Sequence, residues 1–280
     1  MKKNKSIAIH ETAFVTSMFR SSNEQLSQDR FAKLWNNPKT EKWIKNYLND
    51  VSTEEPLTHC LRNRYFLDTL KTLIETHHIE VLINFGSGFS MYPFLLNENL
   101  VNIEIDKHEV IRFKTKKIND WQNKNVLPKR QIYSIGVDFS DHYEDDLKTQ
   151  IETIKDGRKC FILLEGVLFF LDRPSTNRLF NFFDAIQTSG DFIGSGSFRG
   201  ELKSTMAYKR LLNFFDKQII NTGKNEYQTI EDDFYKSIKN YELIDHQDYF
   251  SLSKTYNNSV QLKHDLILNE HFYLLEKEYQ

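Results

Sequence analysis

Between residues 80 and 198, short runs of apolar and β-branched residues alternate with longer segments that have helical spacing. The runs lie at 80–85, 100–105, 131–137, 160–164 and 192–195. Such alternation is typical of parallel strands joined by crossover helices, which cover both faces of one sheet. The sequence therefore predicts an α/β fold.

Two more strand-like runs follow at 241–245 and 271–277. The turn-rich stretch between them, at 253–259, is too short for a helical crossover, so we expect an antiparallel pair. With this pair the sheet has seven strands, most of them parallel. The fold is Rossmann-like.

Segments outside the sheet show apolar residues at three-to-four spacing, which predicts helices at 22–34, 39–48 and 61–74. A long helical insertion is expected at 199–239. We expect one domain with four parts, namely an N-terminal helical lid (1–75), a ligand-binding core (76–198), a helical lid insertion (199–240) and C-terminal strands (241–280). A chain of 280 residues can bury a sizeable core.

Charge and composition exclude several classes of partner. Lys plus Arg number 37 and Asp plus Glu 39, a near-neutral balance that argues against nucleic acid or anionic lipid as the main partner. The most apolar run, 161–171, contains Glu165 and is shorter than the ~20 residues of a membrane span. No apolar signal-peptide segment follows the basic first residues. We expect no membrane partner and leave the oligomeric state open.

The two cysteines, Cys60 and Cys160, have neither metal-ligand spacing nor a disulfide framework around them. Buried free thiols of this kind are typical of a reducing compartment. We therefore expect a cytoplasmic protein without a bound metal.

The first strand leads directly into Gly86-Ser87-Gly88. At this turn of an α/β sheet, glycines let a nucleotide-like ligand approach the backbone. The dinucleotide pattern has a third glycine at the position of Met91, which makes an NAD site less favoured.

Carboxylates end three successive strands at the edge that faces this turn. Asp106, 20 residues after Gly86, can accept hydrogen bonds from ribose hydroxyls. Asp138 can bind an adenine amino group beside the ring of Phe139, and Glu165 ends the next strand. A ligand with adenine, ribose and a cationic group but no phosphate fits this acidic rim. S-adenosyl-L-methionine is such a ligand.

The order of the motifs resembles the leucine carboxyl methyltransferase family, which includes protein phosphatase methyltransferases and many bacterial O-methyltransferases. The matching segments are RNRYFLD at 62–68, NFGSG at 84–88, EID at 104–106 with Lys114 following, Asp138, and LEGVLFFL at 164–171. The resemblance covers nearly the whole chain, and the segment from Glu165 to Leu168 is its most specific part. It implies the class I methyltransferase fold.

The resemblance also implies roles for residues. Arg62, or else Arg64, would bind the methionine carboxylate of the cofactor, because a planar guanidinium holds two oxygens at once. Gly86 would line the floor of the cofactor site, and Glu165 would lie near the methionine end. The full predicted cofactor set is Arg62, Gly86, Gly88, Glu104, Asp106, Asp138, Phe139 and Glu165. The sequence departs from the family in the spacing from Arg62 to Asp68, which is one residue longer.

The reaction that the resemblance implies is O-methylation of a carboxylate or hydroxyl on a small molecule. A carboxylate acceptor is ionised at neutral pH and needs no general base, whereas a phenol would gain from one. Candidates near the acceptor are His10, Phe169 with Phe170, and Arg199. The basic run 114–117 is expected to be a charged helix face and not a nucleic-acid patch.

Two other classes remain open. An NAD-dependent oxidoreductase would share the glycine turn and Asp106, but it would not use the carboxylates at 138 and 165. A methyltransferase fold that only binds its ligand would commonly have lost cofactor residues, and here all of them are present.

Overall fold

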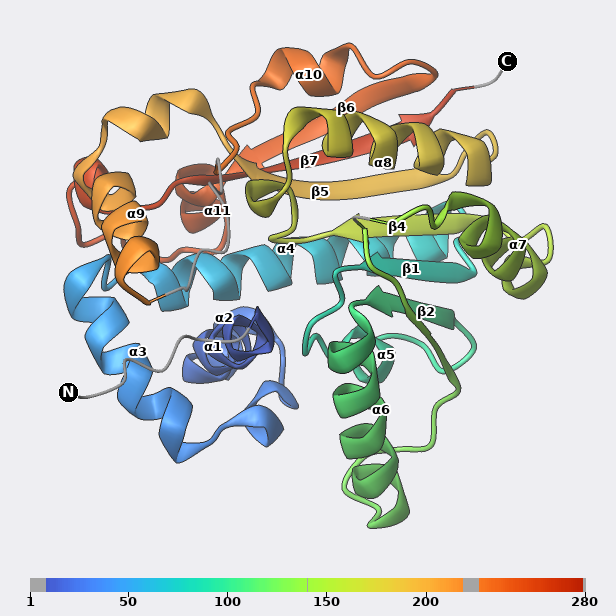
Figure 1. Cartoon of the computed structure of the whole chain (residues 1–280), viewed down its shortest axis with the longest axis horizontal. Helices are drawn as coiled ribbons and strands as arrows, with labels where there is room; N and C mark the ends of the chain where they lie inside the picture. The colour runs from blue at the N-terminus through green and yellow to red at the C-terminus, as the bar shows by residue number, and fades with distance from the viewer. Residues whose placement is uncertain (1–8, 140, 219–226, 279–280) are drawn as a thin grey trace.

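The computed structural model describes residues 9–139, 141–218 and 227–278, and it places a seven-stranded sheet at the centre of the protein (Figure 1). The strand order is β3-β2-β1-β4-β5-β7-β6. The strands are β1 (Val81–Phe85), β2 (Val101–Asp106), β3 (Ile132–Gly136), β4 (Cys160–Leu164), β5 (Phe192–Phe198), β6 (Tyr241–Asp248) and β7 (Glu270–Lys277). All seven predicted strands are confirmed.

Strands β1 to β5 pair in parallel with their neighbours, whereas β7 runs antiparallel to both β5 and β6. The predicted mostly parallel sheet with a final antiparallel pair is therefore confirmed. Strand β7 lies between β5 and β6, so the last strand along the chain is an inner strand of the sheet.

The described helices are α1 (Ile9–Ser22), α2 (Glu24–Ser27), α3 (Pro38–Asp50), α4 (Glu55–Thr76), α5 (Tyr92–Leu95), α6 (His108–Asn123), α7 (Glu144–Lys155), α8 (Arg173–Ile186), α9 (Met206–Gln218), α10 (Asp232–Lys236) and α11 (Tyr249–Thr255). Short 3-10 turns are η1 (Ala32–Trp35), η2 (Leu168–Phe170), η3 (Gly200–Ser204) and η4 (His264–Leu266). Alternate residues of each strand face opposite sides, so Ile83 packs with α7 and α8 while Leu82 packs with α4.

The predicted helix at 22–34 is wrong. Helix α2 ends at Ser27, and Gln28 then takes a left-handed conformation at φ 57°. The carboxylate of Asp29 accepts hydrogen bonds from the backbone N–H groups of Phe31 and Ala32, which makes a turn instead of a continued helix. The predicted turn at 253–259 is wrong at its start, because α11 extends to Thr255.

Helices α1, α3 and α9 gather at one end of the sheet together with η2 (Figure 1). They share an apolar cluster, which we call the lid cluster; its buried members are Val15, Phe19, Tyr47, Val51, Phe169, Leu202, Ala207, Tyr208, Leu211, Phe214, Phe215 and Leu268. The predicted insertion at 199–239 contains η3, α9 and α10, and its residues 219–226 lie outside the described part. That these helices form a lid stays a prediction.

Cys60 and Cys160 are both buried and free, as expected. Among the described residues, no helix combines the length and the apolar character that crossing a membrane requires.

Candidate cofactor site

The glycine turn after β1 is shaped by two left-handed residues, Gly86 at φ 67° and Gly88 at φ 45°. Residues with side chains rarely adopt this conformation. A Cβ atom on Gly86 would lie 2.2 Å from Cγ2 of Val167, in the segment that follows β4. Glycine at position 86 therefore lets the β1 turn and the β4 loop approach each other closely.

Asp106 ends β2 and holds this turn. Its carboxylate accepts hydrogen bonds from the backbone N–H groups of Gly88 and Lys107, each at 2.7 Å. Burial raises the pKa of Asp106, and these two hydrogen bonds partly offset the rise. Two carboxylate oxygens offer about four acceptor positions, so acceptor capacity remains for ligand hydroxyls.

Glu104 lies below the turn, where it forms an ion pair of 2.7 Å with Lys114. Each residue is only 2% exposed, and Nζ of Lys114 also lies 3.5 Å from the carbonyl oxygen of Ser87. Burial raises the pKa of Glu104 and lowers that of Lys114. The expectation that residues 114–117 form a charged helix face is wrong for Lys114, which is buried, whereas Lys116 and Lys117 are exposed. The arrangement gives Glu104 a role in supporting the turn through Lys114, and its predicted contact with the cofactor stays a prediction.

Arg62, on α4, is buried beside the end of β4. Its Nη1 donates to both carboxylate oxygens of Glu270, at 3.0 and 2.8 Å, and its Nε lies 3.3 Å from Oε1 of Glu165. Burial alone would lower the pKa of Arg62, but the charges of Glu270 and Glu165 outweigh it and raise the pKa. The structure thus brings Arg62 and Glu165 together.

Arg64 points elsewhere. Its Nε pairs with Asp68 at 2.5 Å, and its guanidinium stacks over the ring of Tyr256, 4.9 Å from the ring centroid. Of the two candidate arginines, Arg62 therefore lies beside Glu165 and the loop after β4, whereas Arg64 lies beside Asp68 and Tyr256.

Sequence reasoning missed Glu270 and Glu55, which extend this buried polar group. Glu55 begins α4, and burial raises its pKa to about 8, with the negative charge of Glu270 adding to the effect. The hydroxyl of Tyr47 donates to Glu55 at 2.9 Å. Neither carboxylate has a sequence signal, because each pairs with residues of other elements.

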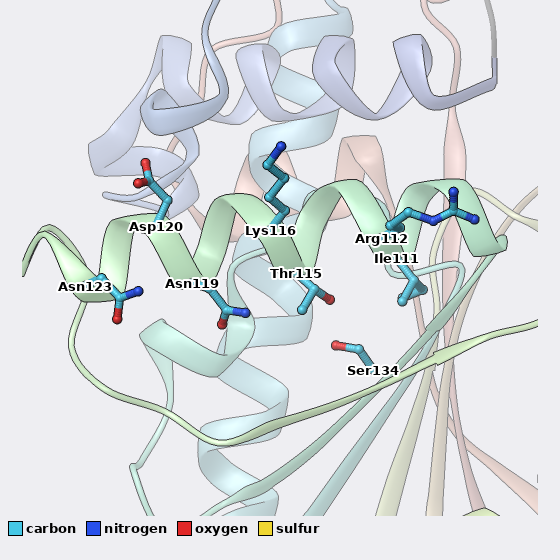
Figure 2. Close-up of a pocket in the computed structure, with 8 residues that line it drawn as sticks. All are labelled: Ile111, Arg112, Thr115, Lys116, Asn119, Asp120, Asn123 and Ser134. Carbon is cyan, nitrogen blue, oxygen red and sulfur yellow. The ribbon is translucent and has the colours of Figure 1, made fainter.

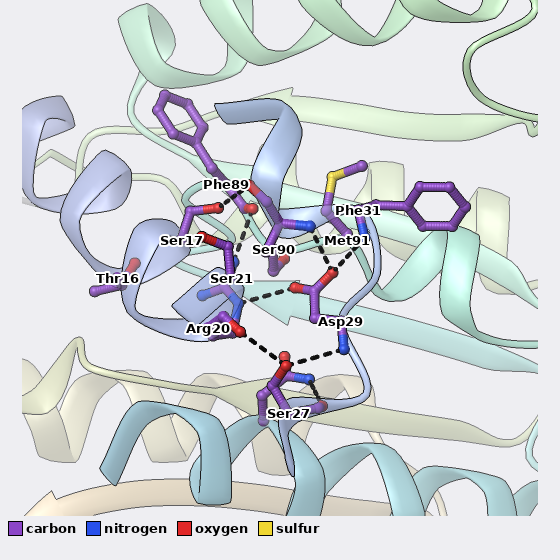
Figure 3. A network of polar contacts seen from close by, with 12 residues as sticks. Thr16, Ser17, Arg20, Ser21, Ser27, Asp29, Phe31, Phe89, Ser90 and Met91 are labelled. Carbon is purple, nitrogen blue, oxygen red and sulfur yellow. Dashed lines mark hydrogen bonds and ion pairs between the residues drawn. The ribbon is translucent and has the colours of Figure 1, made fainter. Parts of the chain in front are cut away.

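The N-terminal helix is tied to the glycine turn through Arg20 (Figure 3). Nη2 of Arg20 donates to the carbonyl oxygen of Phe89 at 2.9 Å, and its Nε pairs with Asp29 at 3.0 Å. Arg20 and Asp29 are both buried. Helix α1 is therefore anchored to the residue that directly follows Gly88.

Asp138 and Phe139 follow β3 at the same sheet edge. Asp138 is exposed, whereas the Phe139 ring is half-buried against Phe85, with 6.2 Å between ring centroids. Phe85 directly precedes the glycine turn, so Phe139 packs beside the turn. In the sheet, β3 lies on one side of β1, whereas β4, which Glu165 follows, lies on the other.

The acceptor candidates have different surroundings. Phe169 is buried in the lid cluster and stacks on Tyr227, with ring centroids 4.7 Å apart, whereas Phe170 is 50% exposed. Arg199 lies 3.5 Å from Asp232 and 3.7 Å from Glu231, so carboxylates already compensate its charge. His10 lies in α1, but its side chain is outside the described part of the chain.

A histidine pair at the ends of β6 and β7 was not predicted. Nε2 of His246 and Nδ1 of His271 lie 2.9 Å apart, and burial lowers the pKa of His271 to about 4. His271 is therefore neutral at pH 7. The two residues are 25 positions apart, and only strand pairing brings them together.

An open groove of about 700 Å³ lies between α6 and the edge strand β3. Figure 2 shows the residues that line it. Ile111, Thr115, Asn119 and Asn123 form a row at four-residue spacing along α6, and Ser134 of β3 faces them. None of the residues predicted to bind the cofactor lines this groove.

The hydroxyl of Ser87 in the glycine turn indicates what kind of ligand fits there. The hydroxyl of Ser87 is buried and has no hydrogen-bond partner among the described residues. A buried hydroxyl without a partner costs about 1–3 kcal/mol. Together with a guanidinium and two carboxylates around the turn, this hydroxyl suits a ligand that carries both charges and hydroxyl groups.

The family model described as leucine carboxyl methyltransferase matches residues 9–184. No curated protein matches the chain by sequence.

Solved structures resemble the whole chain at low identity. A candidate methyltransferase from Thermobifida fusca is 10% identical, covers 99% of this chain and 97% of its own, and has a TM-score of 0.68. A DUF574 family protein from Streptomyces avermitilis is 8% identical, covers 98% of both chains and has a TM-score of 0.64. These likenesses confirm the predicted class I methyltransferase fold.

The family model spans more than half of the chain and confirms the resemblance seen in the motifs. The chain belongs to the leucine carboxyl methyltransferase family.

Proposed function

We propose that the protein is an O-methyltransferase that methylates a carboxylate or hydroxyl oxygen of a small molecule. The observation that carries the methyl-donor part of the proposal is the pair of Arg62 and Glu165 beside Gly166, next to the turn at Gly86. Oxygen as the acceptor atom is proposed from the family, whose model is described as leucine carboxyl methyltransferase. A guanidinium and a carboxylate at one point match the carboxylate and the ammonium of a methionine group.

Each residue has a proposed part in binding. Arg62 would bind the methionine carboxylate and Glu165 the ammonium, while Asp106 would accept from the ribose hydroxyls. Asp138 and Phe139 would hold the adenine. When bound, S-adenosylmethionine supplies a methyl group that the positive sulfur activates.

The protein itself would align the acceptor with the methyl group of the cofactor and keep water away from both. The aromatic side chains of the lid cluster, with Phe169 at their centre, would exclude water from the end of β4. Well-oriented reactants recover on the order of 7–11 kcal/mol of a barrier. Because a carboxylate acceptor is ionised at neutral pH, it requires no proton transfer from these side chains.

Calorimetric titration tests the cofactor part of the proposal. S-adenosylhomocysteine should bind with micromolar affinity and NAD should not bind. Binding of NAD alone would favour an oxidoreductase. If neither ligand bound, the active-enzyme proposal would be contradicted in favour of a methyltransferase fold without activity.

Transfer of a labelled methyl group to a panel of small carboxylic acids, phenols and amines tests the acceptor part. Mild base hydrolyses methyl esters and releases the label as methanol, whereas methyl ethers and methylamines keep the label. Base treatment and mass spectrometry therefore distinguish the products. The Asp106→Ala variant serves as the control for background transfer. Label on amine nitrogen alone would contradict O-methylation.

A further inference from the structure

The side chain of Glu270 is buried in a space on the sheet that the absence of a side chain at Gly196 provides. Glu270 begins β7 opposite Phe198 of β5, and it is 4% exposed. A Cβ atom on Gly196 would lie 2.9 Å from Oε1 of Glu270, so the missing side chain at position 196 leaves space for the carboxylate. The carboxylate points to the face of the sheet that α4 covers, where it meets Arg62.

Arg62 has five N–H donors, and Glu270 and Glu165 contact different nitrogens of its guanidinium. Glu270 takes Nη1 through both of its oxygens, and Glu165 faces Nε at 3.3 Å. The position of a Cβ atom on Gly166 is 3.8 Å from Nη1 and 3.9 Å from Nη2, so the guanidinium lies against the loop after β4.

Without Glu270, the guanidinium would have an unsatisfied Nη1 in a buried place. Its nearest described carboxylate would then be Glu165, and a guanidinium that meets one carboxylate through two nitrogens makes a strong, closed pair. Such a pair would occupy the guanidinium of Arg62 and the carboxylate of Glu165, the two groups that are proposed to bind the methionine part of the cofactor.

We propose that Glu270 is a positioning residue of the cofactor site, which holds Arg62 through Nη1 and so leaves Glu165 to pair with Nε alone instead of closing a two-nitrogen pair with the guanidinium. This inference rests on the proposed role of Arg62 and adds to it a residue from the last strand. A site works best when surrounding residues fix its ligand-binding groups.

The test compares two ligands that differ only in the methionine end. S-adenosylhomocysteine carries the amino and carboxylate groups, whereas 5′-methylthioadenosine lacks them. In the Glu270→Gln variant, affinity for S-adenosylhomocysteine should fall at least about tenfold, the size of one lost charged hydrogen bond. Affinity for 5′-methylthioadenosine should stay within about twofold, as for independent sites.

Two comparisons sharpen this test. Glu276→Gln changes the same residue type on the same face of β7, but at its far end opposite Phe192, and it should leave both affinities unchanged. In the Arg62→Lys background, Glu270→Gln should add little further loss for S-adenosylhomocysteine, because Glu270 acts through Arg62.

Other outcomes would overturn the inference. An equal loss for both ligands would make Glu270 a purely structural residue. A gain in affinity for S-adenosylhomocysteine would make it a competitor of the ligand. If the unmodified protein bound neither ligand, the proposed cofactor site itself would be contradicted, whereas an intact site with an insensitive Glu270→Gln variant would contradict this inference alone.

Discussion

Nζ of Lys114 lies 2.7 Å from Oε1 of Glu104, and both side chains are buried directly beneath the glycine turn. The pair joins α6 to β2, and the same Nζ approaches the carbonyl oxygen of Ser87. The lysine therefore connects the sheet, the helix that follows it and the backbone of the cofactor turn.

Replacement of Lys114 by methionine should strongly destabilise the protein, because it leaves Glu104 as an uncompensated buried charge. We expect the free energy of unfolding to fall by about 3–5 kcal/mol, measured by urea denaturation. Lys116→Met, at an exposed position of the same helix, should change it by no more than about 0.5 kcal/mol. Similar values for the two variants would contradict the importance of the pair.

Asp106→Ala should weaken binding of S-adenosylhomocysteine at least about tenfold, through loss of charged hydrogen bonds to the ribose and of the bond to Gly88. Isothermal titration calorimetry measures the change, and Asp120→Ala on the exposed side of α6 is the matched control. Unchanged affinity in the Asp106 variant would remove the ribose assignment.

Arg62→Lys should weaken S-adenosylhomocysteine more than Arg64→Lys does. A lysine at position 62 cannot hold a carboxylate through two nitrogens, whereas Arg64 is paired with Asp68 on another side of α4. The same titration checks both variants. The reverse order would show that the other arginine is the ligand.

Glu55 should make stability depend on pH. Its pKa is raised to about 8 in the folded protein, so the folded state keeps a proton that the unfolded chain releases above its ordinary pKa. The contribution is fully present below that ordinary value and is lost as the pH rises towards 8, with a slope of at most about 1.4 kcal/mol per pH unit.

Urea denaturation between pH 5 and pH 8.5 measures this effect. Glu55→Gln, which stays neutral, should flatten the decline, while Glu75→Gln at an exposed position of α4 should leave it unchanged. A decline of equal steepness in the unmodified protein and the Glu55→Gln variant would show that Glu55 does not keep its proton.

The sheet could be predicted because its signal is local. Buried parallel strands need continuous apolar runs such as that of β4, which the sequence shows within a few residues. The glycine turn and the carboxylates that follow β2 and β4 could be found for the same reason. These residues lie at the end of a strand or directly after it.

Other features depend on contacts across the chain. The helix predicted at 22–34 ends early because Asp29 caps a turn and pairs with Arg20, and helical spacing carries no sign of either contact. Lys114 belongs to a basic run, yet a carboxylate on β2 takes it into the interior. Glu270 pairs with a residue 208 positions earlier, at a distance where no sequence motif connects the two.

This separation has a consequence for synthesis of the chain. Strand β7 leaves the ribosome after the other six strands of the sheet, yet it inserts between β5 and β6 and carries the partner of Arg62. Until it arrives, α4 holds a cation that has no carboxylate from β7 beside it, and the sheet lacks an inner strand. Nascent chains that stop before residue 270 should therefore expose this gap and bind chaperones. If Arg62 binds the cofactor as proposed, only chains with a completed sheet should bind it.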